Sequence, residues 1–359
     1  MNGRKGAMPI KVLVVDDSAL IRQLLTELLS ADRGIEVVGT ANDPIAAREK
    51  IKALAPDVIT LDIEMPKMDG LSFLEKLMAL RPMPVVVVST LTQKGTDAAL
   101  RALELGAIDY VAKPLIDIRS GMTALGEELV AKVRTAAAAR PRARAMRAAP
   151  SAPLQVDAAL STAGRIVAVG ASTGGVETLQ QLLLQMPATA PAIVITQHMP
   201  AGFTSSFARR LDQQCAMTVV EASDGRRIMP GQVYIAPGAR HLEVTRTGAH
   251  YACRVHDGAP VSGHRPSVDV LFYSVAAAAG ANAMGIILTG MGKDGAHGLL
   301  AMRRAGARTL GQTEASCVVY GMPKAAMQAG AVEQELTVDQ IAREVVRARE
   351  GEATRRGAA

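Results

Sequence analysis

VAVGASTGGVET, residues 167–178, runs from an apolar segment through a loop of small residues into a helix-like pattern. This pattern predicts a strand over 165–170, a tight corner, and an amphipathic helix that begins near Gly175. The corner fits G-x-S-x-G, a strand-to-helix turn that exposes a nucleophilic serine in many hydrolases. Ser172 could alternatively be a helix cap or part of a phosphate cradle. The residues predicted at the same edge of the sheet distinguish between these roles.

Two further strand ends supply the partners that a serine nucleophile needs. The apolar run AIVITQH ends in His198, and the run MGIILTG leads into Asp294. Parallel strands bring their carboxyl ends to one edge of a sheet, so these two residues are expected to lie close to Ser172. The three would act as nucleophile, base and orienting carboxylate. The chain order Ser…His…Asp differs from the Ser…Asp…His order of the α/β-hydrolases, which predicts a different fold.

A second motif overlaps the Asp294 loop and offers an alternative. Three glycines between a strand and a helix fit the pattern G-x-G-x-x-G: Gly290, Gly292 and Gly295. They could bind the dinucleotide of an oxidoreductase, with Glu314 as the ribose acid. Asp294 inside that loop would face a pyrophosphate, where negative charge is unfavourable. The same glycines would let backbone N–H groups near Met291 approach an oxyanion, which favours the hydrolase.

The segment between these motifs has a different character. Residues 225–257 contain short alternating patterns that predict one or two β-hairpins on the flank of the sheet. The next segment, HRPSVDVLFYSV, predicts a helix with Ser267 as its cap and Asp269 in its first turn. Three histidines without metal-ligand spacing are interpreted as surface or rim residues: His241, His256 and His264.

Apolar runs in the first 115 residues also end in polar side chains. The four runs are KVLVVDD (11–17), DVITLD (57–62), PVVVVST (84–90) and AIDYVAKP (107–114). Helix-period segments alternate with them, which predicts a parallel α/β sheet. Carboxylates from Asp16, Asp17 and Asp62 would repel one another there unless a hard cation such as Mg²⁺ joined them. Lys113 and Ser89 would complete a site suited to a phosphoryl group on Asp62.

Composition limits the remaining possibilities. The net charge is +6, and the Arg-, Ala- and Pro-rich stretch after Arg134 predicts a solvated linker, with nucleic-acid binding as the alternative. An aromatic content of 3% argues against a base-stacking surface. No apolar run reaches the roughly 20 residues of a membrane span, and the three cysteines have no metal or redox spacing. We therefore expect a cytoplasmic protein without membrane insertion.

Residues 10–128 resemble a response-regulator receiver domain through VVDDS, LDIEMPKMDG and KP. The resemblance implies a flavodoxin-like α/β fold, followed here by a linker over 129–163. Asp62 matches the phospho-acceptor of that family. Four residues match its Mg²⁺ site, the last through its backbone carbonyl: Asp16, Asp17, Asp62 and Glu64. Ser89 and Tyr110 match the switch positions, and Lys113 matches the family lysine.

Residues 164–349 resemble the catalytic domain of the chemotaxis methylesterases, the CheB family. The motifs are GASTGG, TQHMPAGFT, HRPSVDVLF, LTGMGKDGA and VVYGMPKAA. The resemblance implies a Rossmann-like, doubly wound parallel sheet with a flanking β-hairpin. Ser172, His198 and Asp294 match the family triad, whereas Thr173 and Met291 match residues that shape the oxyanion site. The chain departs from the family at Ser262 and Gly263, where the family often has bulkier polar residues.

The same resemblance implies the reaction. A phosphorylation-activated carboxylic-ester hydrolase would remove methyl groups from γ-glutamyl methyl esters of chemoreceptors and deamidate specific receptor glutamines, in chemotactic adaptation. A histidine kinase of the two-component pathway would be the phosphodonor. The catalytic domain would need no cofactor, and nucleic acid would not be a partner. A receiver-linked oxidoreductase remains the alternative function.

Overall fold

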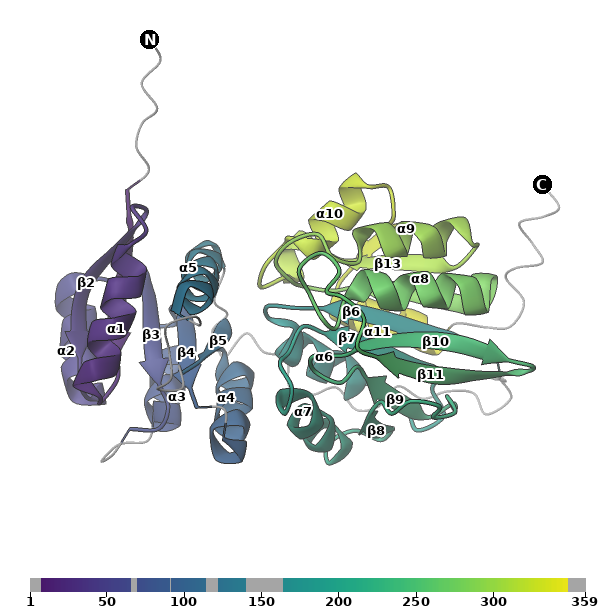
Figure 1. Cartoon of the computed structure of the whole chain (residues 1–359), viewed down its shortest axis with the longest axis horizontal. Coiled ribbons are helices and arrows are strands. Elements are labelled where there is room, and N and C mark those ends of the chain that lie inside the picture. The colour runs from purple at the N-terminus through teal and green to yellow at the C-terminus, as the bar shows by residue number, and fades with distance from the viewer. Residues whose placement is uncertain (1–7, 66–69, 91, 114–121, 140–163, 348–359) are drawn as a thin grey trace, which may run out of the picture. The chain divides into compact units, whose positions relative to one another are not determined.

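The computed structural model describes residues 8–65, 70–90, 92–113, 122–139 and 164–347. The chain divides into two compact units, residues 1–147 and 148–359, each described by itself below (Figure 1). Within the described residues, no helix is long and apolar enough to cross a membrane.

The first unit is a five-stranded parallel sheet in the order β2-β1-β3-β4-β5. Its strands are β1 (Ile10–Val15), β2 (Ile35–Ala41), β3 (Val58–Asp62), β4 (Val85–Ser89) and β5 (Asp109–Ala112). Its helices are α1 (Ala19–Ser30), α2 (Pro44–Leu54), α3 (Gly70–Leu80), α4 (Gln93–Leu105) and α5 (Met122–Ala138). Helices cover the sheet, so the central strands are buried along their whole length, which is why they read as unbroken apolar runs. The predicted flavodoxin-like fold is confirmed.

Helix α5 corrects the expected start of the linker. We expected a linker from residue 129, but α5 continues to Ala138, and Leu129 and Val133 are fully buried. These two lie one turn apart on the helix face that packs against the unit. Arg134, interpreted as part of the linker, pairs with Asp32 at 2.6 Å. The rest of the expected linker, residues 140–163, lies outside the described residues.

The second unit contains a seven-stranded parallel sheet in the order β14-β13-β12-β6-β7-β9-β8. Its strands are β6 (Ile166–Ala171), β7 (Ala192–Gln197), β8 (Thr218–Glu221), β9 (Gln232–Ile235), β12 (Ala283–Ile287), β13 (Arg308–Gln312) and β14 (Gln334–Leu336). A separate antiparallel hairpin consists of β10 (His241–Thr247) and β11 (His250–His256). The predicted doubly wound sheet with a flanking hairpin is confirmed. Strand β9, interpreted from its pattern as part of the flanking hairpins, instead pairs with β7 and β8 in the main sheet.

Helices cover both faces of this sheet. They are α6 (Gly175–Leu183), α7 (Phe203–Asp212), α8 (Val268–Ala279), α9 (Ala296–Arg304), α10 (Met322–Gln328) and α11 (Val338–Arg347). Figure 1 shows α8, α9 and α10 on one face and α6 and α7 on the other. Because the chain winds outward from β6 in both directions, β6 and β12 flank the topological switch point. Ligands of doubly wound sheets bind beside the carboxyl ends of such strands.

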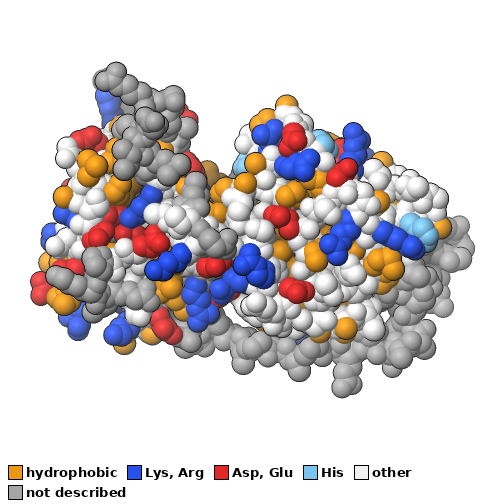
Figure 2. Space-filling view, turned by 60° about the horizontal axis from the view of Figure 1, so that its bottom comes forward, with side chains coloured by type: hydrophobic (Ala, Val, Ile, Leu, Met, Phe, Trp, Pro, Cys, Tyr) orange, Lys and Arg blue, Asp and Glu red, His pale blue; other side chains and the backbone are white. Residues whose placement is uncertain are grey.

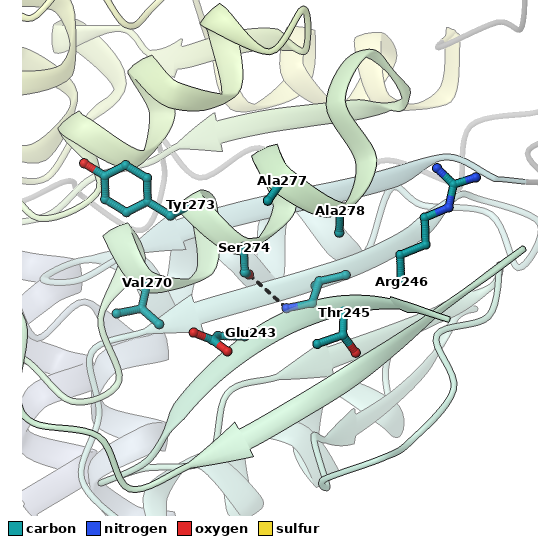
Figure 3. Close-up of a pocket in the computed structure, with 9 residues that line it drawn as sticks. Glu243, Thr245, Arg246, Val270, Tyr273, Ser274, Ala277 and Ala278 are labelled. Carbon is teal, nitrogen blue, oxygen red and sulfur yellow. Dashed lines mark hydrogen bonds between the residues drawn. The ribbon is translucent and has the colours of Figure 1, made fainter. Parts of the chain in front are cut away.

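Helix α8 also packs against the hairpin. The Val244 N–H of β10 donates to Ser274 Oγ of α8 at 2.9 Å, and a shallow groove separates the two elements (Figure 3). Its lining includes Tyr273, which is half exposed, but none of Ser172, His198 and Asp294. The groove is therefore distinct from the site predicted at the sheet edge.

Charged side chains of both signs are mixed on the face of the molecule that Figure 2 shows. On the face seen in Figure 2, Lys and Arg side chains lie among Asp and Glu, so the described residues of that face form no extended basic stripe. A phosphate backbone would require such a stripe.

Candidate active site

Ser172 and His198 follow directly on paired residues of two neighbouring strands. In the β6–β7 pair, Ala171 lies opposite Gln197, and the His198 N–H donates to the Ala171 carbonyl at 3.2 Å. Because neighbouring strands lie about 4.8 Å apart, the serine and the histidine leave the sheet as neighbours. The structure thus places these two predicted residues at the carboxyl ends of adjacent strands, beside the switch point, with His198 Nδ1 free of hydrogen-bond partners among the described residues.

Hydrogen bonds hold the loop that carries Ser172. Its N–H donates to the Thr289 carbonyl at 3.0 Å, and its carbonyl accepts from the Gly175 N–H at 2.7 Å and from Gln197 Nε2 at 3.0 Å. The N-cap of α6 is Gly174, with a φ of 76°, and no side chain caps this helix. Ser172 is therefore not the helix cap that its position allowed, and its hydroxyl is not used to begin α6.

Gly290 lies against Ser172 beyond the end of β12. A Cβ on Gly290 would lie 2.8 Å from Ser172 Cβ and 2.3 Å from Met322 Sδ, so only glycine allows this close approach. The next residue, Met291, has a partly exposed side chain, whereas Thr173 is buried. Thr173 follows Ser172 in the chain, and Met291 follows Gly290, which packs on Ser172. Their part in an oxyanion site stays a prediction.

Asp294 is almost completely buried and accepts four hydrogen bonds. Its Oδ2 faces His198 Nε2 at 2.8 Å and the Val268 N–H at 2.7 Å, and its Oδ1 accepts from Ser267 Oγ at 2.8 Å and the Asp269 N–H at 3.1 Å. Three of these donors come from the start of α8, where the helix dipole favours a carboxylate. Burial alone would raise the pKa of Asp294, but the His198 bond and the backbone donors outweigh it and lower that pKa. Asp294 thus remains ionised beside the histidine.

The glycine-rich loop around Asp294 does not form an open phosphate cradle. Gly290 packs on Ser172, and a Cβ on Gly295 would lie 2.5 Å from Val268 Cγ1. The Asp294 carboxylate, which lies between them in the loop, is buried and accepts hydrogen bonds from the start of α8. The dinucleotide alternative therefore finds no support in the structure.

His264, interpreted above as a rim residue, stacks on His198. The ring centroids are 3.8 Å apart and the planes differ by 10°. Burial, and then the neighbouring His198, lower the pKa of His264. Nitrogen atoms of both rings and an oxygen of Asp294 lie within 4.8 Å of one another. Stacked rings direct their lone pairs along parallel planes rather than toward one point, so this geometry does not suit a metal ion.

His241 also contradicts the surface interpretation, because it is only 1% exposed, whereas His256 stays partly exposed. His241 Nδ1 accepts from the Ser267 N–H at 3.2 Å, and its Nε2 faces the Ala259 carbonyl at 3.0 Å. Ser267 caps α8 as predicted. Its bond to Asp294 was not predicted, since a cap motif does not show which distant carboxylate its hydroxyl faces.

The predicted acidic cluster of the first unit lies at the carboxyl ends of β1 and β3. Carboxylate oxygens of Asp16, Asp17 and Asp62 lie within 4.8 Å of one another. Lys113 Nζ lies 3.0 Å from Asp16 Oδ2 and 2.8 Å from Asp62 Oδ2. Burial, and then the charge of Asp62, raise the pKa of Asp16. Burial opposes the charge on Lys113, but the two carboxylates outweigh it and raise the lysine pKa. These oxygen donors fit Mg²⁺.

Two other predicted residues of this unit have separate partners. The Glu64 N–H donates to Asp62 Oδ1 at 3.0 Å, and its carboxylate accepts from Thr90 Oγ1 at 2.7 Å. The Glu64 side chain is thus engaged by Thr90, and the part of its backbone carbonyl in metal binding stays a prediction. Ser89 Oγ donates to the Gly95 carbonyl at 3.1 Å, in the turn that begins α4.

Tyr110 is buried beside a lysine that sequence analysis did not identify. Lys132 Nζ lies 4.9 Å from the centre of the Tyr110 ring and donates to the Tyr110 carbonyl at 2.6 Å. Burial opposes the charge on Lys132, but Asp109 and Glu128 outweigh it and raise the lysine pKa. Lys132 was missed because it lies in the part of α5 that was expected to be linker.

The second unit places a serine, a histidine and a buried carboxylate at the switch point of a doubly wound sheet, and the first holds an acidic cluster with a lysine. These features define a serine-type hydrolase joined to a phospho-acceptor domain. Residues 167–345 match the family model of the CheB methylesterases, and residues 12–125 match that of the response regulator receiver domains. The chain belongs to the CheB methylesterase family and carries a receiver domain, as the sequence motifs led us to expect.

Similar proteins cover nearly the whole chain. A protein-glutamate methylesterase/protein-glutamine glutaminase of Salmonella typhimurium is 56% identical over 94% of this chain and 96% of its own. The protein of the same name from Bordetella parapertussis is 57% identical over the same shares. The solved CheB methylesterase catalytic domain of Thermotoga maritima is 36% identical, covers 51% of this chain and 98% of its own, and has a TM-score of 0.50.

Proposed function

We propose that this protein hydrolyses γ-glutamyl methyl esters of chemoreceptors, deamidates receptor glutamines, and is activated when Asp62 is phosphorylated. The observation that carries the proposal is the bond between His198 and the fully paired Asp294, next to Ser172. The relatives' names, methylesterase and glutaminase, indicate the two reactions. An oxidoreductase function has no comparable support.

The hydrogen bond to Asp294 fixes the tautomer of His198. Because Nε2–H donates to the carboxylate, the lone pair lies on Nδ1, which is buried and has no hydrogen-bond partner among the described residues. Nδ1 takes the hydroxyl proton of Ser172 as its Oγ attacks the ester carbonyl. The ionised Asp294 stabilises the imidazolium that forms.

The remaining steps return the enzyme to its starting state. Backbone N–H groups near Met291 stabilise the negative oxygen of the tetrahedral intermediate. His198 gives its proton to the leaving group, which departs as methanol from an ester or ammonia from a glutamine. Water then loses a proton to His198 and attacks the acyl-enzyme, which releases Ser172 and leaves a glutamate carboxylate.

We assign control of the hydrolase activity to phosphorylation of the first unit. Asp16, Asp17 and Asp62, with the Glu64 carbonyl, would hold Mg²⁺, which supplies positive charge to an incoming phosphoryl group. Lys113 adds a second positive charge 2.8 Å from Asp62. The Asp62 carboxylate accepts the phosphoryl group from the phosphohistidine of a chemotaxis histidine kinase. Ser89 and Tyr110 are assigned the switch role.

The partners of the reaction are chemoreceptors as substrate and the kinase as phosphodonor. A cytoplasmic setting agrees with Cys253 and Cys317, which are buried in the second unit and form no disulfide. Neither nucleic acid nor membrane insertion has a part in this proposal.

The test measures methanol release from methylated receptor by the full chain. We expect turnover that rises on addition of a small phosphodonor with Mg²⁺, and no such rise in the Asp62→Asn protein. Ammonia release from receptor with glutamine at the modification sites tests deamidation. Absence of methanol release with and without the phosphodonor would contradict the proposed activity.

A further inference from the structure

His264 lies face to face with the histidine that the proposed reaction uses as its base. The centroid distance of 3.8 Å and the interplanar angle of 10° are those of a full ring stack. The stacked ring covers one face of His198, while the edge of His198 carries the Asp294 bond at Nε2. One hydrogen bond fixes one point of an imidazole ring, whereas a stack also restricts the plane in which the ring lies.

A tight turn holds His264 in this position. Val261 and His264 exchange two backbone hydrogen bonds, of 3.0 and 2.9 Å, across the pair Ser262–Gly263. Ser262 has a φ of 53° and Gly263 a φ of 79°, the signs that a type I′ turn requires at both central positions. Ser262 and Gly263, where we expected a departure from the family, are therefore the two central residues of the turn.

Side-chain contacts fix the ring and the chain that follows it. His264 Nδ1 faces the Ser262 carbonyl at 2.8 Å, so the ring is held by its own turn. The guanidinium of Arg265 donates to the carbonyls of Asp257 and Gly258 at 3.3 and 3.0 Å. The turn is thus anchored independently of Asp294 and of the serine loop.

We propose that His264 is a positioning residue, whose stacked ring limits the directions in which His198 Nδ1 can meet the hydroxyl of Ser172. This inference rests on the proposed function, because it assigns a role to a neighbour of the proposed base. Nδ1 has no hydrogen-bond partner among the described residues, so the Asp294 bond at Nε2 and the stack with His264 are the contacts that orient the ring. Small errors in the placement of reacting groups cost large factors in rate.

The role predicts which property of the side chain matters. A flat ring at this position is needed, whereas a titrating nitrogen is not. His264→Phe keeps a ring that can stack on His198, and His264→Ala removes it. His250→Ala is a matched control, because His250 is an exposed histidine of the same unit whose ring contacts Arg227.

The experiment measures kcat and KM for methylated receptor with the phosphorylated full chain. We expect His264→Ala to lower kcat by roughly 10- to 100-fold with KM nearly unchanged. His264→Phe should recover most of the loss, and His250→Ala should match the unaltered chain. Thermal unfolding of each variant shows whether the second unit remains folded.

A second readout removes the receptor from the assay. Diisopropyl fluorophosphate reacts with an activated serine and releases fluoride, so labelling of Ser172 reports on the activation of the serine without the receptor. Labelling should slow in His264→Ala and recover in His264→Phe. Unchanged kcat in His264→Ala, equal losses in the two variants, or a loss confined to KM with normal labelling would overturn the positioning role. Full methanol release by Ser172→Ala would instead refute the proposed function.

Discussion

The two units both place a carboxylate at the carboxyl end of a parallel strand, yet they treat it in opposite ways. Asp294 accepts four hydrogen bonds, and its pKa is lowered despite burial. Asp16 shares a single lysine with Asp62, and burial together with Asp62 raises its pKa. The Asp294 site is the complete site, because all the hydrogen bonds to its carboxylate are present in the folded chain. The Asp16–Asp62 site is the incomplete site, because its carboxylates repel one another and share one lysine.

This difference corresponds to two kinds of task. A group that orients a base must be in the same state before and after each turnover, so donors fixed in advance serve it best. A group that receives a signal must change its interactions when a cation or a phosphoryl group arrives. The excess negative charge of Asp16, Asp17 and Asp62 makes that change favourable.

The largest expected effect tests whether the complete site acts alone in the chemistry. Ser172→Ala and His198→Ala should each reduce methanol release by roughly 10⁴-fold or more, while Asp294→Ala keeps a small residual activity, because it orients rather than reacts. Phosphorylation of Asp62 in the same proteins is the control and should be normal. Near-normal turnover by Ser172→Ala would remove the contrast between the two units.

The next effect tests the incomplete site. Asp62→Asn removes the acceptor carboxylate, whereas excess EDTA with the unaltered chain leaves the clustered carboxylates to repel a phosphoryl anion. Each should reduce phosphate incorporation by roughly 100-fold. Unstimulated methanol release should persist in both cases. Stable labelling of Asp62→Asn with radioactive phosphodonor would show that another residue is the acceptor.

A smaller effect tests whether Asp294 needs all its donors. Ser267→Ala removes one hydrogen bond to the carboxylate and should lower kcat about 10-fold, in line with the strength of bonds to charged groups. Ser274→Ala is the matched control, because that hydroxyl lies on the same helix and accepts from Val244 N–H. Equal kcat values for the two variants would mean that the other three donors suffice.

The smallest effect concerns stability. The pKa of Asp16 is raised in the folded state, so folding binds a proton, and stability falls as pH rises through the folded pKa. Asp16→Asn removes this penalty and keeps an oxygen for the Ser18 N–H at 2.9 Å. We expect the first unit to gain about 1 kcal/mol at pH 7–8 in chemical denaturation of the full chain without Mg²⁺. A loss of stability would show that Asp16 is already well compensated.

Sequence patterns predicted those residues of both sites that lie at the ends of strands. Ser172 and His198 in the second unit and Asp62 in the first each end or follow an apolar run, and parallel pairing brings such residues to one edge of their own sheet. Strand β9 was misplaced because an alternating pattern does not reveal its pairing partner.

The residues that sequence missed depend on contacts between distant segments. Alanine-rich composition concealed α5, whose Leu129 and Val133 are buried against the first unit. The stack of His264 on His198 joins positions 66 residues apart through a turn, and no local periodicity encodes it. The roles of Thr173 and Met291 stay predictions.

Two of the four donors to Asp294 are main-chain N–H groups, those of Val268 and Asp269. Such donors survive every substitution except proline, so single mutations rarely delete them. The limit at the start of α8 is space: a Cβ on Gly170 or Gly295 would lie 2.2 or 2.5 Å from Val268 Cγ1. Because Val268 is also fully buried, a larger or a polar side chain at this position would disturb the start of α8, and with it the main-chain donors to Asp294.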